Sequence, residues 1–323
     1  MNVPVPPVVW PLELPVRPLP DVSWVQSVLA YPPVKVFFPV PILCAIAPAI
    51  WWFFRDTWRD LDAEAARYRA EVAARGAVDY RPYLCFLIAA SVLTMQEYFG
   101  GRSFYDDVIR VPLETYGRAH PGLHVQKYDE LFSYAFWSFA RFVGYVAIPL
   151  PAWKLIFPKD SLLDMGLRGR GFFSHLWIYG LCLAIVLPVM LLVSTQPDFG
   201  NYYPFYKLSS RSWFDLLCWE GIYWLQFFSL ELFFRGWMVG ALRRTMGAGA
   251  IFAMAVPYCM IHYGKPYFEA QGAIVAGVVL GSLAMRTRSI YAGFLVHITV
   301  AVSMDLLSLW KRGALPIVFW AAG

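Results

Sequence analysis

Several uninterrupted apolar stretches, each close to the length needed to cross a lipid bilayer, dominate this sequence. A helix needs about 20 consecutive apolar residues to span the hydrocarbon core. The composition agrees, because 59% of the residues are apolar and only 15% are charged, against about 25% charged in soluble domains. The runs lack the alternating pattern of a barrel strand. The predicted fold class is therefore all-α, a polytopic transmembrane helical bundle.

The apolar stretches predict about eight membrane-spanning helices and hence a multi-pass integral protein of the cell membrane. The first contains Pro48, where we expect a kink. The distribution of Lys and Arg among the connecting segments slightly favours an orientation in which both chain termini lie outside. The predicted spans are 36–54, 83–99, 131–157, 172–194, 213–242, 250–263, 270–286 and 289–310.

Four regions divide the chain. Residues 1–34 form a Pro-rich tail that is expected to be irregular and not to be a cleaved signal peptide, because it lacks a basic start followed by an apolar run. Residues 35–212 form an N-terminal transmembrane region. Residues 213–306 form a core that holds the polar residues discussed below, and residues 307–323 form a C-terminal tail.

A charged insert follows the first span and predicts an amphipathic helix over 56–76. Its apolar residues recur at three- and four-residue spacing, which is typical of a helix lying on the membrane surface. A solvated helix packed on another loop is the alternative interpretation. The apolar positions are Trp58, Leu61, Ala65, Tyr68 and Val72.

The remaining composition mainly excludes functions. The five cysteines lie inside apolar stretches and never at two- or four-residue spacing, so they predict neither a disulfide scaffold nor a cysteine metal site. The net charge of +5 is scattered along the chain, whereas a nucleic-acid binder clusters its basic residues. We therefore expect membrane lipid as a partner and no nucleic acid.

Two ionisable residues stand deep inside the fifth predicted span. Glu231 and Arg235 are one helical turn apart, with the acid first, which is well aligned for a salt bridge. Charges at that depth cost several kcal/mol each by the lower estimates, and they usually mark a functional site. The alternative is a structural ion pair that ties two helices together.

Two histidines lie in later apolar stretches. Counted from the turn near residues 244–248, Glu231 lies about 20 Å into one helix and His262 about 21 Å into the next. Measured from the same side, His297 is about 12 Å and Asp305 about 24 Å into the last span. Each histidine alone could simply bond a facing carbonyl. Together these depths predict that the polar groups can meet.

A ladder of small residues occupies the seventh span. Ala273, Gly277 and Gly281 recur at four-residue spacing, a pattern that lets transmembrane helices approach closely. Such packing would hold the polar residues of the neighbouring helices in a fixed arrangement.

A carboxylate, a guanidinium and two imidazoles in a dry bundle are suited to activating a water molecule. The carboxylate can take the proton of the water. His262 and His297 can either bind a divalent metal such as zinc or stabilise the oxyanion formed when a carbonyl is attacked. This chemistry would support peptide-bond hydrolysis within the membrane.

Three motifs in this region resemble those of the CAAX prenyl protease and bacteriocin-processing (CPBP, or Abi) family of intramembrane proteases. That signature consists of E-E-x-x-x-R, then an aromatic-x-x-x-H, then H-x-x-x-N or H-x-x-x-D, on successive helices. The matching segments are 231–236, 258–262 and the residues from His297 onward. The resemblance covers residues 213–306, under a third of the chain, in the correct order.

The resemblance implies roles for four residues. The second glutamate and the arginine of the first motif match Glu231 and Arg235. The two motif histidines match His262 and His297. The implied activity is that of an intramembrane, metalloprotease-like endopeptidase with these four residues in the catalytic site.

Two positions depart from the family pattern. The first glutamate of the motif, regarded in the family as the group that activates water, falls on Leu230, and the final asparagine or aspartate falls on Ala301. The substitute carboxylates to consider are Glu269 and Asp305. Glu220 shares a helix face with Glu231 but lies about 16 Å along the helix, which is too far.

The leading hypothesis is an intramembrane endopeptidase that resembles CAAX prenyl proteases and hydrolyses a peptide bond in a protein or peptide substrate with a membrane-associated segment. The alternative is a catalytically inactive CPBP homologue that acts as a membrane binding or scaffold protein, which the departures at Leu230 and Ala301 favour. A third hypothesis is a small transporter that uses the buried charges as a proton relay.

Overall fold

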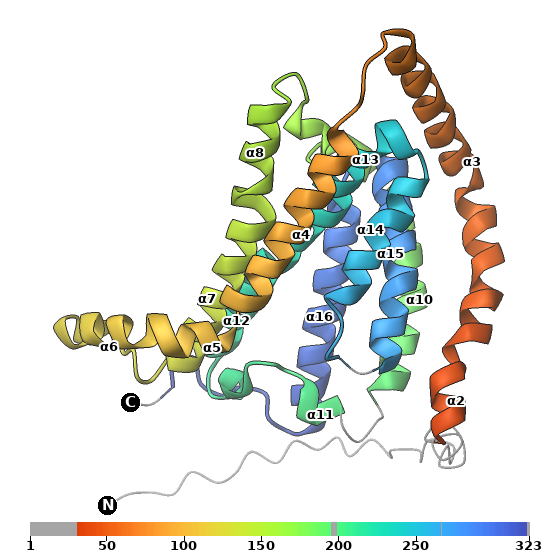
Figure 1. Ribbon diagram of the computed structural model, residues 1–323. Coiled ribbons are helices and arrows are strands. Elements are labelled where there is room, and N and C mark those ends of the chain that lie inside the picture. The colour runs from red at the N-terminus through yellow and green to blue at the C-terminus, as the bar shows by residue number, and fades with distance from the viewer. Residues whose placement is uncertain (1–30, 195–198, 266, 322–323) are drawn as a thin grey trace, which may run out of the picture. The chain divides into compact units, whose positions relative to one another are not determined.

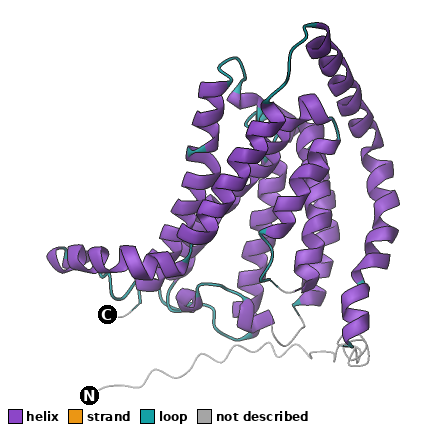
Figure 2. Ribbon diagram, in the orientation of Figure 1, coloured by secondary structure: helices purple, strands orange, loops and turns teal. Residues whose placement is uncertain are grey.

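The computed structural model describes residues 31–194, 199–265 and 267–321. The predicted Pro-rich tail over 1–34 lies almost entirely outside these residues. Within the described ranges, the only β-type pairing is an isolated bridge between Leu167 and Ser289, and the regular structure is otherwise helical (Figure 2). The all-α fold class is therefore confirmed.

The chain divides into two units, residues 1–51 and 52–323. The N-terminal half contains α2 (Pro32–Phe37), α3 (Pro39–Ala74), α4 (Arg81–Phe99), α5 (Arg102–Phe104), α6 (Arg110–Ala119), α7 (Asp129–Phe142) and α8 (Pro149–Ile156). The C-terminal half contains α9 (Arg170–Ser174), α10 (Leu176–Val193), α11 (Phe199–Tyr202), α12 (Trp213–Glu231), α13 (Val239–Met246), α14 (Gly249–Met260), α15 (Tyr267–Thr287) and α16 (Tyr291–Lys311). Single π-helical turns join α5 to α6, α7 to α8 and α12 to α13, at Tyr105–Ile109, Val143–Ala147 and Leu232–Met238. Short 3₁₀ turns lie at Pro121–Leu123, Leu162–Asp164 and Lys207–Ser210.

Among the residues that the structure describes, four helical stretches are long and apolar enough to cross a membrane, namely Pro32–Ala74, Asp129–Ile156, Glu269–Thr287 and Tyr291–Lys311. A fifth arises if Arg81–Phe99 and Arg102–Ala119, bent by 54° at their break, form one span. The apolar helices indicate a membrane protein, but eight crossings are not confirmed. The difference lies partly in Leu176–Pro188 and Gly249–Met260, which are apolar but too short to meet the length of a full span.

The predicted first span and the predicted surface helix are one continuous helix, α3. Within the second unit, the apolar stripe of this helix is covered by protein. Trp58 donates a hydrogen bond from Nε1 to Ser282 Oγ at 2.9 Å. Leu61 and Ala65 are almost completely buried. Part of the apolar face of this helix is therefore packed on other parts of the chain, and its position on the membrane surface stays a prediction.

The turn between α13 and α14 is fixed by α3. The backbone N–H of Ala248 donates to Asp62 Oδ1 at 2.8 Å, which satisfies a donor at the start of α14. Gly247 has φ +59°, and a Cβ at this position would clash with Asp62. Glycine is needed here for both reasons. The hairpin of α13 and α14 is thereby held in place.

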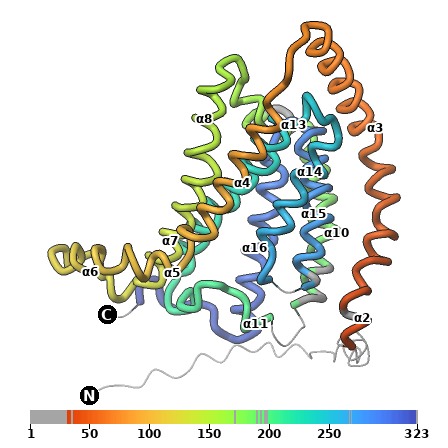
Figure 3. Tube along the Cα trace, in the orientation of Figure 1, coloured from red at the N-terminus to blue at the C-terminus, as the bar shows by residue number. Residues whose placement is uncertain are grey.

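The C-terminal helices pack closely in the second unit. In Figures 1 and 3, α14, α15 and α16 run beside one another, and α12 packs against α7 and α16. A Cβ on Gly277 would lie 3.2 Å from the Cβ of Ala255, and one on Gly281 would lie 3.0 Å from Ile251 Cγ2. The small-residue ladder of α15 thus lies against α14, as predicted from the sequence.

Candidate functional site

Glu231 is the last residue of α12, and Arg235 lies in the π-helical turn that follows it. Arg235 Nη1 is 3.0 Å from Glu231 Oε1, and their side chains are 0% and 1% exposed. The ion pair expected from the four-residue spacing is therefore present. π-Helical turns inside longer helices are frequently found at functional sites.

His297 reaches the same carboxylate from α16. Its Nδ1 is 2.8 Å from Glu231 Oε1. Gly293 lies one turn earlier on α16, and a Cβ there would come 2.5 Å from Glu231 Oε2. The absence of a side chain at Gly293 lets α16 approach the carboxylate closely.

Tyr258 of α14 joins the cluster and was missed as a site residue in the sequence. Its hydroxyl is 3.2 Å from His297 Nε2. Its ring lies beneath the Arg235 guanidinium, with the carbon of that group 3.7 Å from the ring centroid, a cation–π contact. The sequence feature that could have identified Tyr258 is the aromatic residue of the second motif, which falls on this position. Its hydroxyl group, not its ring, supplies the contact with the histidine.

His262 lies just past the end of α14. Its Nδ1 is 2.8 Å from the carbonyl oxygen of Tyr258, and the two rings are 4.7 Å apart. The structure therefore places His262 beside the cluster through Tyr258, whereas Arg235 and His297 each contact Glu231 directly. The residues of the cluster come from α12 with the turn after it, from α14 and from α16.

The hydrogen-bond partners indicate the tautomer of each imidazole. A backbone carbonyl can only accept, so Nδ1 of His262 carries a proton. His297 Nδ1 lies 2.8 Å from the Glu231 carboxylate, which can only accept, so Nδ1 is the protonated nitrogen even though the pair lacks the alignment of a normal hydrogen bond. In their neutral forms, both rings therefore present Nε2 as the nitrogen with a lone pair.

The charged groups are close together but poorly hydrogen-bonded. Within the described residues, both Glu231 carboxylate oxygens and all three Arg235 nitrogens lack a hydrogen bond of normal geometry, although the ion-pair distances are short. Distance alone does not make a strong hydrogen bond, because the donor must also be aligned. Buried groups left in this state call for a functional explanation.

The two candidate substitute carboxylates lie elsewhere. Glu269 on α15 is paired with Lys265 Nζ at 2.7 Å and accepts from the Tyr203 hydroxyl at 3.2 Å. Asp305, eight residues beyond His297 on α16, accepts from Trp219 Nε1 at 2.7 Å. Their pairings are with residues outside the Glu231 cluster.

The two positions that depart from the motif add no polar group. Leu230 and Ala301 are 5% and 6% exposed and pack in the interior. Phe227, one turn before Glu231, stacks on His297 with ring centroids 5.2 Å apart. An aromatic ring thus covers one face of the imidazole.

The metal site suggested by the two histidines stays a prediction. His297 directs Nδ1 to Glu231 and Nε2 to Tyr258, and His262 uses Nδ1 for a carbonyl. Nε2 is therefore the ring nitrogen through which either histidine would bind a metal. In the described part of the chain, no three His, Cys, Asp or Glu side chains gather in a way that could hold a metal ion.

Comparison with known proteins bears on residues 212–303. This segment matches the family model described as "Type II CAAX prenyl endopeptidase Rce1-like". No curated protein and no solved structure matches the chain. The match covers all four residues that the motif resemblance selected. The resemblance to the CPBP family is thereby confirmed, and residues 212–303 are an Rce1-like segment, consistent with a protein of that family.

Proposed function

We propose that this protein is an intramembrane endopeptidase that hydrolyses a peptide bond in a membrane-associated protein substrate, as a multi-pass protein of the cell membrane. The match to a protease family implies a protein substrate. The observation that supports catalysis most directly is the 2.8 Å contact between His297 Nδ1 and Glu231 Oε1, made between two helices in the protein interior.

The contact suits His297 to the role that the missing first glutamate would otherwise have. With Nδ1 held by Glu231, Nε2 is the basic nitrogen, and the carboxylate stabilises the imidazolium that forms when Nε2 takes a proton. Arg235 balances the charge of Glu231, which allows a carboxylate to persist in the interior. This assignment does not need a carboxylate at the position of Leu230.

The proposed reaction begins with a water molecule at Nε2 of His297. As the water oxygen bonds to the substrate carbonyl carbon, one of its protons passes to Nε2 and the carbonyl π electrons move to oxygen. The Tyr258 hydroxyl, 3.2 Å from Nε2, is positioned to donate a hydrogen bond to that oxygen. When the C–N bond breaks, the imidazolium returns the proton to the leaving amine.

His262 has a supporting position in this scheme. Its Nδ1–H bond holds the Tyr258 backbone, and its ring contacts the Tyr258 ring, so it helps to position the Tyr258 hydroxyl. The expected roles of His262 and His297 as metal ligands stay a prediction, and no step above depends on them.

The proposal is tested with the purified full chain in liposomes and a fluorogenic farnesylated peptide ending in a CAAX sequence. We expect cleavage by the unaltered protein and a loss of about 10²–10⁴-fold in His297→Gln, the range that general acid–base groups contribute. His120→Gln, an exposed histidine in contact with Tyr116, is the matched control and should cleave normally. Unchanged cleavage by His297→Gln would refute the mechanism.

The second candidate function is a catalytically inactive scaffold. The observation that favours it is the buried Leu230 at the motif position of the family's water-activating glutamate. In that case the Glu231 to Arg235 pair has a purely architectural role. The absence of cleavage by the unaltered protein, together with retained binding of the farnesylated peptide, would select this function.

A further inference from the structure

A cavity of about 370 Å³ lies between α3 and the C-terminal end of α15, away from the Glu231 cluster. The apolar part of its lining includes Leu61 and Met285, both of which are buried. Its charged side chains lie on two walls, with Asp56 and Asp60 from α3 and Arg286 and Arg288 from the end of α15 and the turn after it.

The cavity lies where both helices change from apolar to charged. From Pro39 to Phe54, α3 has no charged residue, and Arg55 is the first. From Ala270 to Met285, α15 has none, and Arg286 is the first. In a membrane-spanning helix this change marks the boundary between the hydrocarbon and the lipid head groups. The cavity is therefore at the depth of the head groups.

Two opposite charges line the cavity without meeting. Asp60 and Arg286 are both exposed, and within the described residues neither forms an ion pair, so they lie more than 4.0 Å from each other. Arg286 is positioned by Phe53, whose carbonyl oxygen accepts from Nη1 at 3.4 Å and whose ring lies 4.9 Å from the guanidinium carbon. The guanidinium is therefore held in place without being neutralised.

The other two charged residues that line the cavity each form an ion pair with a neighbour. Arg288 is paired with Glu64 at 3.1 Å, and Asp56 with Arg59 at 2.9 Å. Their side chains are 45% and 69% exposed, so these pairs are weak and can rearrange. One wall can therefore receive an anion and the other a cation.

We propose that this cavity binds a phosphoethanolamine group, with the phosphate at Arg286 and Arg288 and the ammonium at Asp60 and Asp56. Arginine suits a phosphate because its N–H groups can bind two oxygens at once. A primary ammonium can donate hydrogen bonds to both carboxylates. The location at the head-group boundary favours phosphatidylethanolamine in the bilayer as the source. This inference is independent of the proposed protease activity.

The test is native mass spectrometry of the purified full chain with added phosphatidylethanolamine or phosphatidylglycerol. The unaltered protein should retain one phosphatidylethanolamine in preference to phosphatidylglycerol. Asp60→Asn and Arg286→Gln should each weaken retention by about tenfold, because each removes a charge-assisted contact. Both residues are exposed, so neither change should unfold the protein.

The matched controls are Glu71→Gln and Arg75→Gln, which remove exposed charges near the other end of α3 and should leave retention unchanged. Equal retention of the two lipids, or equal losses in the control variants, would overturn the proposal. Soluble phosphoethanolamine that binds as tightly as the lipid would support the site and assign its ligand to the aqueous phase.

Discussion

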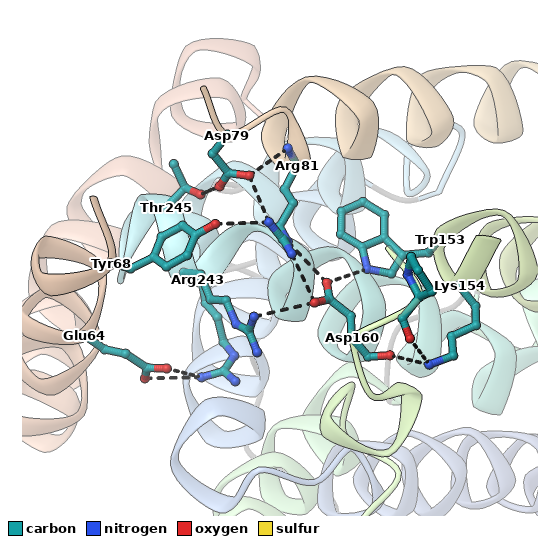
Figure 4. Close-up of polar contacts among 11 residues, drawn as sticks. Glu64, Tyr68, Asp79, Arg81, Trp153, Lys154, Asp160, Arg243 and Thr245 are labelled. Atoms are coloured by element: carbon teal, nitrogen blue, oxygen red, sulfur yellow. Dashed lines mark hydrogen bonds and ion pairs between the residues drawn. The ribbon is translucent and has the colours of Figure 1, made fainter. Parts of the chain in front are cut away.

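The cluster around Glu231 and the network around Asp160 both join acids to arginines, but in different surroundings. Asp160 lies in the loop that follows α8. Arg81, at the start of α4, donates to both oxygens of Asp160, at 3.1 and 3.2 Å, and to the Tyr68 hydroxyl at 3.0 Å (Figure 4). Asp160 also accepts from Trp153 Nε1 at 3.2 Å. These groups have several aligned hydrogen bonds each and keep some contact with solvent.

The Glu231 cluster has the same kinds of charge with fewer aligned hydrogen bonds and almost no exposure. A fully hydrogen-bonded network stabilises a fixed arrangement of loops. Buried polar atoms without aligned partners instead remain able to bind a reacting molecule. The two regions therefore differ in hydrogen bonding and burial rather than in the presence of charge.

The largest expected effect on stability comes from Arg235→Met. It leaves the Glu231 carboxylate buried without its guanidinium, which costs about 3–5 kcal/mol of unfolding free energy. Adding Glu231→Gln removes the unpaired charge and should restore much of that loss. Denaturant unfolding in detergent measures both variants. If the double variant is as unstable as Arg235→Met, the loss comes from packing and not from an unpaired charge.

A smaller effect is expected from Asp160→Asn. Burial by itself raises the pKa of Asp160, but the hydrogen bonds and charge of Arg81, together with the Trp153 hydrogen bond, hold that pKa below its ordinary value. The pairing therefore stabilises the fold above the unfolded-state pKa of about 3.9, and this contribution is lost as the pH falls through the lower folded-state pKa.

At neutral pH, Asp160→Asn should lower the free energy of unfolding by about 1.5–3 kcal/mol, the usual range for hydrogen bonds to charged groups. Peptide cleavage should remain unchanged. Asp164→Asn, whose partner Arg168 and own side chain are largely exposed, is the control and should have little effect. A loss of cleavage in Asp160→Asn with unaltered stability would reverse the assignment of the two regions.

The smallest expected change in stability is that of Gly293→Ala. The added Cβ would press on Glu231 Oε2 and push α16 away, at a cost of about 1–3 kcal/mol. Cleavage should fall as the contact with His297 lengthens. Gly272→Ala is the control, because a Cβ there meets nothing within 4 Å and alanine favours a helix. Normal cleavage by Gly293→Ala would show that the close approach is dispensable.

The sequence predicted most of the helices and part of the site. The i,i+4 spacing of Glu231 and Arg235 was sufficient for their ion pair, because both lie on one helical segment. The contact between Glu231 and His297 was not predictable from depths of about 20 and 12 Å along straight helices. It depends on how α12 and α16 tilt and on the close approach at Gly293.

Other features depended on tertiary packing in the same way. Periodicity found the apolar face of the helix over 56–76 but could not show that Leu61 and Ala65 would be covered by protein. Asp305 was a reasonable candidate by depth, yet its side chain is bonded to Trp219. The sequence alone showed that Leu230 and Ala301 depart from the family motif. The contact of the Tyr258 hydroxyl with His297 depends instead on how α14 packs against α16.

The most direct test of the proposed dyad is a double-mutant cycle on kcat/KM for the farnesylated peptide, using Glu231→Gln, His297→Gln and the two together. Residues that act as a unit give non-additive losses. We predict that the double variant is no slower than the slower single variant. Losses that multiply in the double variant, or full activity in either single variant, would contradict the proposal that Glu231 and His297 work as one proton-accepting group.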